Sequence, residues 1–221
     1  FITTDPDLNS SQILKDTLIE LEQNVIPLFN KKSNYDIIGK FYEEFLRYAG
    51  VANVKKGIVL TPNHVTKLFA ELVDLKTDDV ILDTCCGTGA FLIAGMNSLV
   101  EKIENSEIGD KKQRIDGLKQ NQLIGFEKST TMYSLAISNM LFRGDGKSRI
   151  FQEDVFSQSA IDRLKKLRDT DKIIPSIGFI NPPYGGKDTK ENPTKKEIQF
   201  IENLLDSVTR YGIVIAPLST F

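Results

Sequence analysis

The chain has 221 residues, enough for one sizeable hydrophobic core and a small additional segment. Its net charge of −2 argues against a strongly basic, stand-alone nucleic-acid-binding module. Neither a signal peptide nor an apolar run long enough to cross a bilayer is visible in the sequence, so no membrane partner is expected. The only two cysteines, Cys85 and Cys86, are adjacent, which favours free thiols and a cytoplasmic location.

Three helices are predicted before residue 75. Apolar residues recur at helical spacing from Leu8 to Ile26, and again from Asp36 to Tyr48. A third helix is predicted to begin at Thr61-Pro62, with Thr61 as the N-cap and Pro62 in the first helical position. The buried stripe of this third helix is predicted to consist of Val65, Leu68, Phe69 and Leu72.

After residue 75, short apolar runs alternate with helical patterns. Strands are predicted at residues 80–82, 122–126, 149–151, 176–180 and 212–216, and helices at residues 90–103, 130–141, 159–167 and 198–208. Repeated strand–helix units predict a doubly wound α/β fold, with a mostly parallel sheet and helices on both faces. The polar stretch 105–120 is interpreted as a surface excursion and residues 185–196 as a mobile loop.

Two glycines with one residue between them follow the first predicted strand. Gly87 and Gly89 would let the backbone turn sharply and approach a ligand closely, just before a helix whose N-terminal N–H groups are unpaired. In a doubly wound sheet such a turn lies at the carboxyl edge of the strands, where ligands bind. The alternative is a turn that serves packing only. A dinucleotide site is disfavoured, because position 92 is leucine where that pattern has its third glycine.

Acidic residues follow the second and third predicted strands. Glu127 comes directly after the second strand, where a carboxylate can accept hydrogen bonds from a ribose diol. Asp154 follows the third strand closely and could accept a hydrogen bond from an adenine amino group. As an alternative, each could be a loop acid or a helix N-cap.

The segment Asn181-Pro182-Pro183-Tyr184 directly follows the fourth predicted strand, at the same edge of the sheet. Its two prolines stiffen the backbone, so the segment presents an amide, a peptide carbonyl and an aromatic ring in fixed positions. Two such acceptors, the Asn181 side-chain oxygen and the Pro182 carbonyl, can bind both N–H bonds of an exocyclic amine and direct its lone pair at a methyl donor. Tyr184 would stack on the base, which must be flipped out of a duplex.

With these motifs in this order, the chain resembles the gamma-type amino-DNA methyltransferases, and within them the modification subunit of type I restriction–modification systems. The motifs are Thr61 to Val65, Asp83 to Leu92 and Asn181 to Tyr184, preceded by a family-like helix from Asp36 to Leu46. The resemblance implies a class I S-adenosylmethionine-dependent methyltransferase fold in residues 57–221, after an N-terminal helical segment in residues 1–56. Since the chain ends soon after the fifth strand, this domain is expected to be truncated at its C-terminal end.

The resemblance implies S-adenosyl-L-methionine as the cofactor and assigns roles to residues at the carboxyl edge. The Thr-Pro pair would line the methionine end, the acid and glycines of the turn would hold the amino acid part, and Glu127 and Asp154 would bind ribose and adenine. The implied cofactor-binding residues are Thr61, Pro62, Asp83, Gly87, Gly89, Phe91, Glu127, Asp154 and Phe200. The implied catalytic residues are Asn181, Pro182 and Tyr184. No cysteine, histidine or acidic cluster has metal-ligand spacing, so no metal is expected.

The implied reaction is methylation of adenine N6 in double-stranded DNA, with the base flipped out and with a specificity subunit and a restriction subunit as partners. Cytosine N4 remains open as the target, because it uses the same amine chemistry. Two alternatives stay open as well: an N-methyltransferase acting on protein glutamine or ribosomal RNA guanine, and a non-catalytic scaffold subunit.

Overall fold

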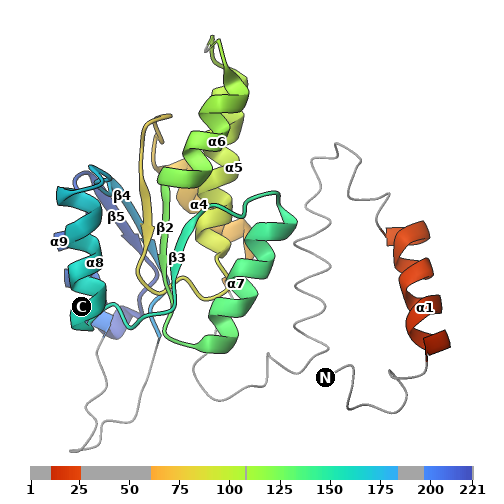
Figure 1. Cartoon of the computed structure of the whole chain (residues 1–221). Helices are drawn as coiled ribbons and strands as arrows, with labels where there is room; N and C mark the ends of the chain where they lie inside the picture. The colour runs from red at the N-terminus through yellow and green to blue at the C-terminus, as the bar shows by residue number, and fades with distance from the viewer. Residues whose placement is uncertain (1–10, 26–60, 108, 184–196, 221) are drawn as a thin grey trace, which may run out of the picture. The chain divides into compact units, whose positions relative to one another are not determined.

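A computed structural model describes residues 11–25, 61–107, 109–183 and 197–220 (Figure 1). The chain divides into two units, residues 1–51 and 52–221, and each is described by itself. In the first unit, helix α1 spans Ser11–Glu20 and a π-helical turn follows at Leu21–Val25, within the helix predicted from Leu8 to Ile26. The predicted helix from Asp36 to Tyr48 lies outside the described residues. The predicted boundary between residues 56 and 57 stays a prediction.

The second unit contains a five-stranded sheet with the order β3-β2-β1-β4-β5. Every neighbouring pair of strands is parallel, as the repeated strand–helix pattern predicted. The strands are β1 (Ile81–Asp83), β2 (Leu123–Phe126), β3 (Arg149–Phe151), β4 (Ile177–Ile180) and β5 (Tyr211–Val214). Every residue of β1, β2 and β4 is buried, because helices cover both faces of the sheet.

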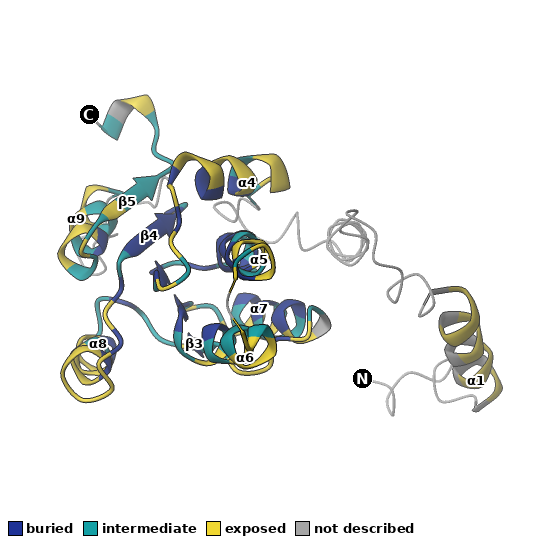
Figure 2. Ribbon diagram, turned by 90° about the horizontal axis from the view of Figure 1, so that it is seen from above, coloured by how far each residue is buried: buried dark blue, intermediate teal, exposed yellow. Residues whose placement is uncertain are grey.

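The helices lie in two layers, one on each face of the sheet (Figures 1 and 2). One layer contains α4 (Asn63–Leu72), α5 (Ala90–Glu104), α6 (Lys111–Asn121) and α7 (Thr130–Phe142). The other contains α8 (Gln158–Asp169) and α9 (Glu197–Ser207). The chain changes faces where it passes from β3 to β4, so the strand order reverses between β1 and β4. This reversal is the point in such sheets at which ligands bind.

Most of the polar stretch 105–120, interpreted as a surface excursion, forms helix α6, which the sequence pattern did not predict. Its side chains are mainly polar, and Leu118 is its only fully buried residue, with Ile115 packed partly against the same core. A helix that buries so few apolar side chains has little of the periodicity from which helices are predicted. The side chain of Asp110 accepts a hydrogen bond from the N–H of Gln113, which stabilises the start of the helix.

Helix α4 differs from its prediction in two respects. It begins at Asn63, with Pro62 in the capping position, so Thr61 is not the N-cap. Its buried residues are Thr66, Phe69 and Ala70. Of the predicted stripe, Phe69 is buried and Val65 packs partly against the core. Leu68 and Leu72 are 49% and 65% exposed, because the face that meets the core is rotated towards Thr66 and Ala70.

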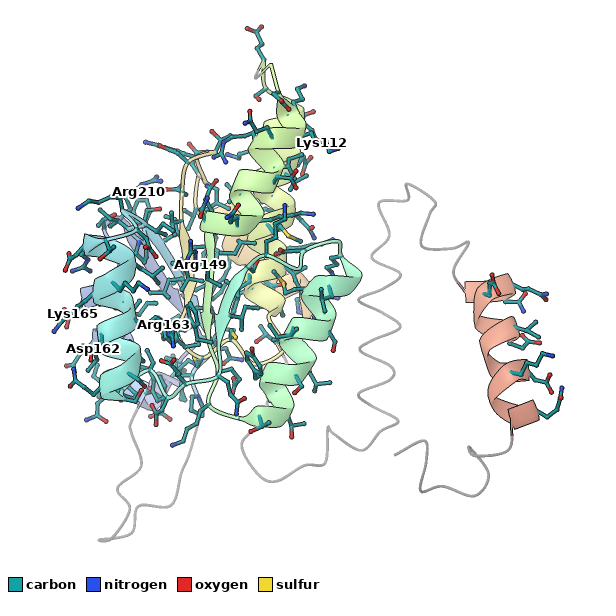
Figure 3. The ribbon with its side chains drawn as sticks, viewed as in Figure 1. Lys112, Arg149, Asp162, Arg163, Lys165 and Arg210 are labelled. Carbon is teal, nitrogen blue, oxygen red and sulfur yellow. The ribbon has the colours of Figure 1, made fainter. Side chains whose placement is uncertain are left out.

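The amino edge of the sheet is held by polar side chains that are paired with one another. Arg210, which Figure 3 shows at this edge, donates to both carboxylate oxygens of Asp79 at 2.5 and 2.6 Å. Nearby, the buried amide of Gln122 donates to the carbonyls of Thr77 and Asp79 at 2.9 and 2.6 Å. Its amide oxygen accepts from Arg114 at 2.5 Å. These contacts join the start of β1 to α6, β2 and β5.

The close packing of α9 on β4 gives a stability prediction. A Cβ at Gly178 would lie 2.6 Å from Cδ1 of Leu204, whose side chain is fully buried. We expect Gly178→Ala to lower the free energy of unfolding by about 1–3 kcal/mol through overpacking, measured by urea denaturation. In the control Gly117→Ala, on α6, the new methyl group meets no atom within 4 Å. The free energy of unfolding of that control should rise by about 0.5–1 kcal/mol. An equal loss of unfolding free energy in both variants would contradict the packing argument.

Candidate active site

The turn between β1 and α5, residues 84–89, is here called the glycine turn. Gly87 and Gly89 have φ angles of +54° and +80°. This is the left-handed backbone conformation, which residues other than glycine adopt only at a cost in free energy. The N–H of Gly89 donates to the carbonyl of Cys86 at 2.7 Å and closes the turn. Helix α5 then begins without a side-chain cap, so its first N–H groups can bind an anionic group of a ligand.

Cys86 holds the glycine turn against β2. Its N–H donates to the carbonyl of Phe126 at 2.9 Å, and its sulfur lies 3.1 Å from the position that a Cβ on Gly125 would occupy. Gly125 therefore leaves the space in which the thiol packs. Burial raises the pKa of both Cys85 and Cys86 well above the ordinary value, so neither supplies a thiolate at neutral pH. Both cysteines are free, as the sequence predicted.

A buried carboxyl group, that of Asp83, and a half-buried one, that of Glu127, lie beside the turn. Asp83 is 1% exposed and accepts a hydrogen bond from the N–H of Cys85 at 3.1 Å. Glu127 accepts from the N–H of Gly87 at 2.9 Å and from the N–H of Ser129 at 2.7 Å. Burial raises the pKa of Asp83 to about 8, and the negative charge of Glu127 contributes to this rise. Burial also raises the pKa of Glu127. A cationic group bound between these acids would relieve the cost of ionising them.

Asp154 lies after β3, at the same edge of the sheet, and is more exposed than Asp83. Its carboxylate forms an ion pair with Lys128, with 3.0 Å between Nζ and Oδ2. Its Oδ1 accepts from the N–H of Phe156 at 3.0 Å. The ring of Phe156 packs against that of Phe200 on α9, with the two centroids 4.8 Å apart. Asp154 and Phe200 are therefore linked through Phe156.

The Asn-Pro-Pro-Tyr segment begins immediately after β4. The amide nitrogen Nδ2 of Asn181 donates to the hydroxyl oxygen of Thr61 at 3.0 Å, which joins two motifs 120 residues apart. This contact gives Thr61 a different role from the predicted N-cap. Pro182 is buried and Pro183 is exposed, while Tyr184 lies outside the described residues.

The ring of Phe91 lies in the hydrophobic core. It is 3% exposed and packs against Phe69 and Phe179, with centroid distances of 4.8 and 5.9 Å. Phe91 faces inward on the first turn of α5, so its ring supports the glycine turn through packing, and its predicted contact with the cofactor stays a prediction.

Sequence reasoning missed Asn139 on α7. Its side chain is 6% exposed, and its Nδ2 donates to the carbonyl of Thr88 in the glycine turn at 3.0 Å. One signal in the sequence could have revealed it. Asn139 is a polar residue on the same helix face as Ala136 and Met140, which are apolar and buried and lie near Gly89. Such a buried polar group needs a specific hydrogen-bond partner.

These features together define a class of protein. A parallel sheet with a glycine turn after its first strand and acids after the next two has the architecture of class I S-adenosylmethionine-dependent methyltransferases. A Listeria monocytogenes chain assigned to that class has the same fold, with a TM-score of 0.55 and 17% identity over 82% of this chain and 55% of that one. More specifically, residues 33–210 match the N-6 DNA methylase family, and the chain belongs to that family.

Relatives with names from restriction–modification systems cover most of this chain. A type II restriction enzyme and methyltransferase from Heyndrickxia coagulans is 35% identical over 90% of this chain and 30% of its own length. A type I restriction enzyme methylase subunit from Methanocaldococcus jannaschii is 31% identical over 78% of this chain and 28% of its own length. The structure of a Vibrio vulnificus chain assigned as a type I modification subunit has a TM-score of 0.51. It is 27% identical and covers 68% of this chain and 29% of its own length. The chain thus spans about a third of the length of these relatives.

None of the described helices combines the length and hydrophobicity that a membrane-spanning segment needs.

The burial of Asp83 predicts a pH dependence of stability. The unfolded chain releases the Asp83 proton near the ordinary pKa of 3.8, whereas the folded protein keeps it up to about pH 8. The folded state therefore binds more protons across this window, and its free energy of unfolding falls as the pH rises. We expect the stability of Asp83→Asn relative to wild type to increase from about pH 4 to about pH 8 and then level off, as measured by urea denaturation. If the difference in unfolding free energy between Asp83→Asn and wild type does not vary with pH, the raised pKa of the buried Asp83 is contradicted.

Proposed function

We propose that this chain is the cofactor-binding and catalytic part of a DNA methyltransferase that methylates N6 of adenine, as in the modification subunit of a type I restriction–modification system. The observation that carries the proposal is the 3.0 Å hydrogen bond from Asn181 to Thr61. It joins the segment suited to binding an amine to the Thr-Pro motif, at the edge of the sheet where β4 ends and where the glycine turn and the acids also lie. Membership of the N-6 DNA methylase family supports the same reaction.

The carboxyl edge fits S-adenosyl-L-methionine, which when bound supplies an electrophilic methyl group on a sulfonium. Asp83 would face the cofactor's ammonium, and the uncapped N–H groups of α5 would bind its carboxylate. Gly87 has no atom within 4 Å of the position of a Cβ, so the backbone there is open to close approach. Glu127 would accept hydrogen bonds from the ribose through the remaining lone pairs of its carboxylate.

Binding of the adenine part would require a change at Asp154. Lys128 and Asp154 are exposed by 78% and 37%, and their ion pair covers one carboxylate oxygen. An exposed pair of this kind contributes about 0–1 kcal/mol, so separating it costs little. The Lys128 side chain would then move away, and Asp154 could accept from the adenine amino group. Phe200, packed on Phe156, would border the same subsite.

Asn181 and Pro182 would position the target amine. With Nδ2 of Asn181 bonded to Thr61, the amide is oriented so that its Oδ1 is the atom that accepts from N6. The Pro182 carbonyl would accept from the second N–H, and Tyr184 would stack on the flipped base. These contacts direct the nitrogen lone pair at the methyl carbon. The proton that N6 loses on methylation passes to solvent, and no strong base is required.

The substrate and partners follow from the same proposal. The reactive base is an adenine flipped out of double-stranded DNA. Since the net charge of −2 gives little attraction to phosphates, a specificity subunit would supply DNA affinity and base recognition, and a restriction subunit would complete the system. We place this assembly in the cytoplasm, where DNA and free thiols occur together.

The direct test of the reaction is transfer of a labelled methyl group to DNA by the full-length protein with its partners, followed by mass spectrometry of the digested nucleosides. The proposal predicts N6-methyladenine. N4-methylcytosine would correct the target base. Label in protein or RNA, with none in DNA, would refute the proposal in favour of glutamine or guanine methylation.

The proposed role of Asn181 predicts that catalysis and cofactor binding separate. Asn181→Ala should lower the rate of methyl transfer by about 100-fold or more, because a preorganised polar contact is lost in the transition state. The dissociation constant for the cofactor, measured by isothermal titration calorimetry, should change little. The control Asn105→Ala, on the exposed end of α5 at the amino edge, should leave both quantities unchanged. Wild-type turnover by Asn181→Ala would refute the catalytic role of Asn181.

A further inference from the structure

The glycine turn is held on two sides by side chains from different elements. Glu127, after β2, accepts from the N–H of Gly87, and Asn139, on α7, donates to the carbonyl of Thr88. The two contacts therefore act on consecutive residues of the turn. Ala136, one helical turn before Asn139, lies 3.7 Å from the position that a Cβ on Gly89 would occupy. Helix α7 thus packs against the turn and also forms a hydrogen bond with it.

The amide of Asn139 is itself held in one orientation. The guanidinium of Arg143, the C-cap residue of α7, donates to the Asn139 side-chain oxygen and, at 3.2 Å, to its backbone carbonyl. Because the oxygen is bound by a cation, the amide nitrogen must face Thr88. The Asn139 side chain is 6% exposed, so water does not readily replace this donor.

We propose that Asn139 is a positioning residue for the cofactor: it fixes the Thr88 peptide so that the glycine turn has its binding conformation before the cofactor arrives. This inference rests on the proposed function. Loops that are already in the bound conformation avoid the entropy cost of ordering on binding. Without the Asn139 donor, the carbonyl of the half-buried Thr88 would lose its partner, and the turn would rearrange to provide another.

The opposite edge of the sheet offers a matched control. Gln122 is also 6% exposed, also donates to loop carbonyls, and also has an arginine, Arg114, on its amide oxygen. It holds residues 77–79 at the amino edge, before β1, whereas Asn139 holds the glycine turn after β1. A residue with a merely structural role would behave alike at either edge.

The test compares Asn139→Asp with Gln122→Glu. Each substitution keeps the shape and the oxygen that pairs with arginine, and replaces the donor to the loop carbonyl with a carboxylate oxygen. Isothermal titration with S-adenosyl-L-methionine should show about tenfold weaker binding for Asn139→Asp, equivalent to about 1.4 kcal/mol. Binding by Gln122→Glu should be unchanged. Because the new carboxylate also adds a negative charge beside the turn, Asn139→Ala is needed to show that weaker binding comes from the missing donor.

The outcomes separate the two proposals. Failure of the folded wild-type protein to bind S-adenosyl-L-methionine would refute the proposed function. Normal binding by wild type and by Asn139→Asp would refute only the role of Asn139, as would an equal loss of affinity in both variants. Circular dichroism checks folding. Asn139→Ala, which removes the donor without adding charge, is measured alongside and should also bind about tenfold more weakly, so wild-type affinity in either folded Asn139 variant would overturn the inference.

Discussion

The carboxylate of Glu127 links the end of β2 to the turn that follows β1, and the geometry of the site depends on this link. One oxygen accepts from Gly87 and the other from Ser129, so a single side chain sets the distance between two strand ends. Cys86 packs beside Gly125 on the same strand, and α5 begins from the turn so positioned. The strand order reverses beside this turn, which brings the segment after β4 to the same edge.

The two edges of the sheet differ in whether a buried carboxyl group has a cationic partner. At the amino edge, Asp79 is 3% exposed and is compensated by Arg210 through both carboxylate oxygens. At the carboxyl edge, Asp83 is buried next to another acid, and its pKa is raised to about 8. A buried charge without a cationic partner costs stability, and such sites persist where a ligand supplies the partner. The amino edge therefore stabilises the fold, whereas at the carboxyl edge the proposed cationic ligand would supply the partner that Asp83 lacks among the described residues.

Much of the fold followed from local pattern, because buried parallel strands form short apolar runs that alternate with helices. Helix α6 escaped prediction because it buries few apolar side chains, and the exposed Leu68 and Leu72 show that apolar spacing does not identify which side of a helix meets the core. The turn, the acids and Asn181 could be found from motifs that follow strands. The contacts of Asn181 with Thr61 and of Asn139 with Thr88 could not, because they join residues 120 and 51 positions apart and exist only once the sheet has assembled.

The central claim is that the glycine turn and the neighbouring strand ends at the carboxyl edge form one site for S-adenosyl-L-methionine. Hydrogen–deuterium exchange with and without this cofactor tests it most directly, since it reports on each backbone segment separately. Saturating cofactor should slow exchange in residues 84–92 and 127–130 and leave residues 76–80, at the amino edge, unchanged. Unchanged exchange in residues 84–92, or protection confined to the amino edge, would contradict the account.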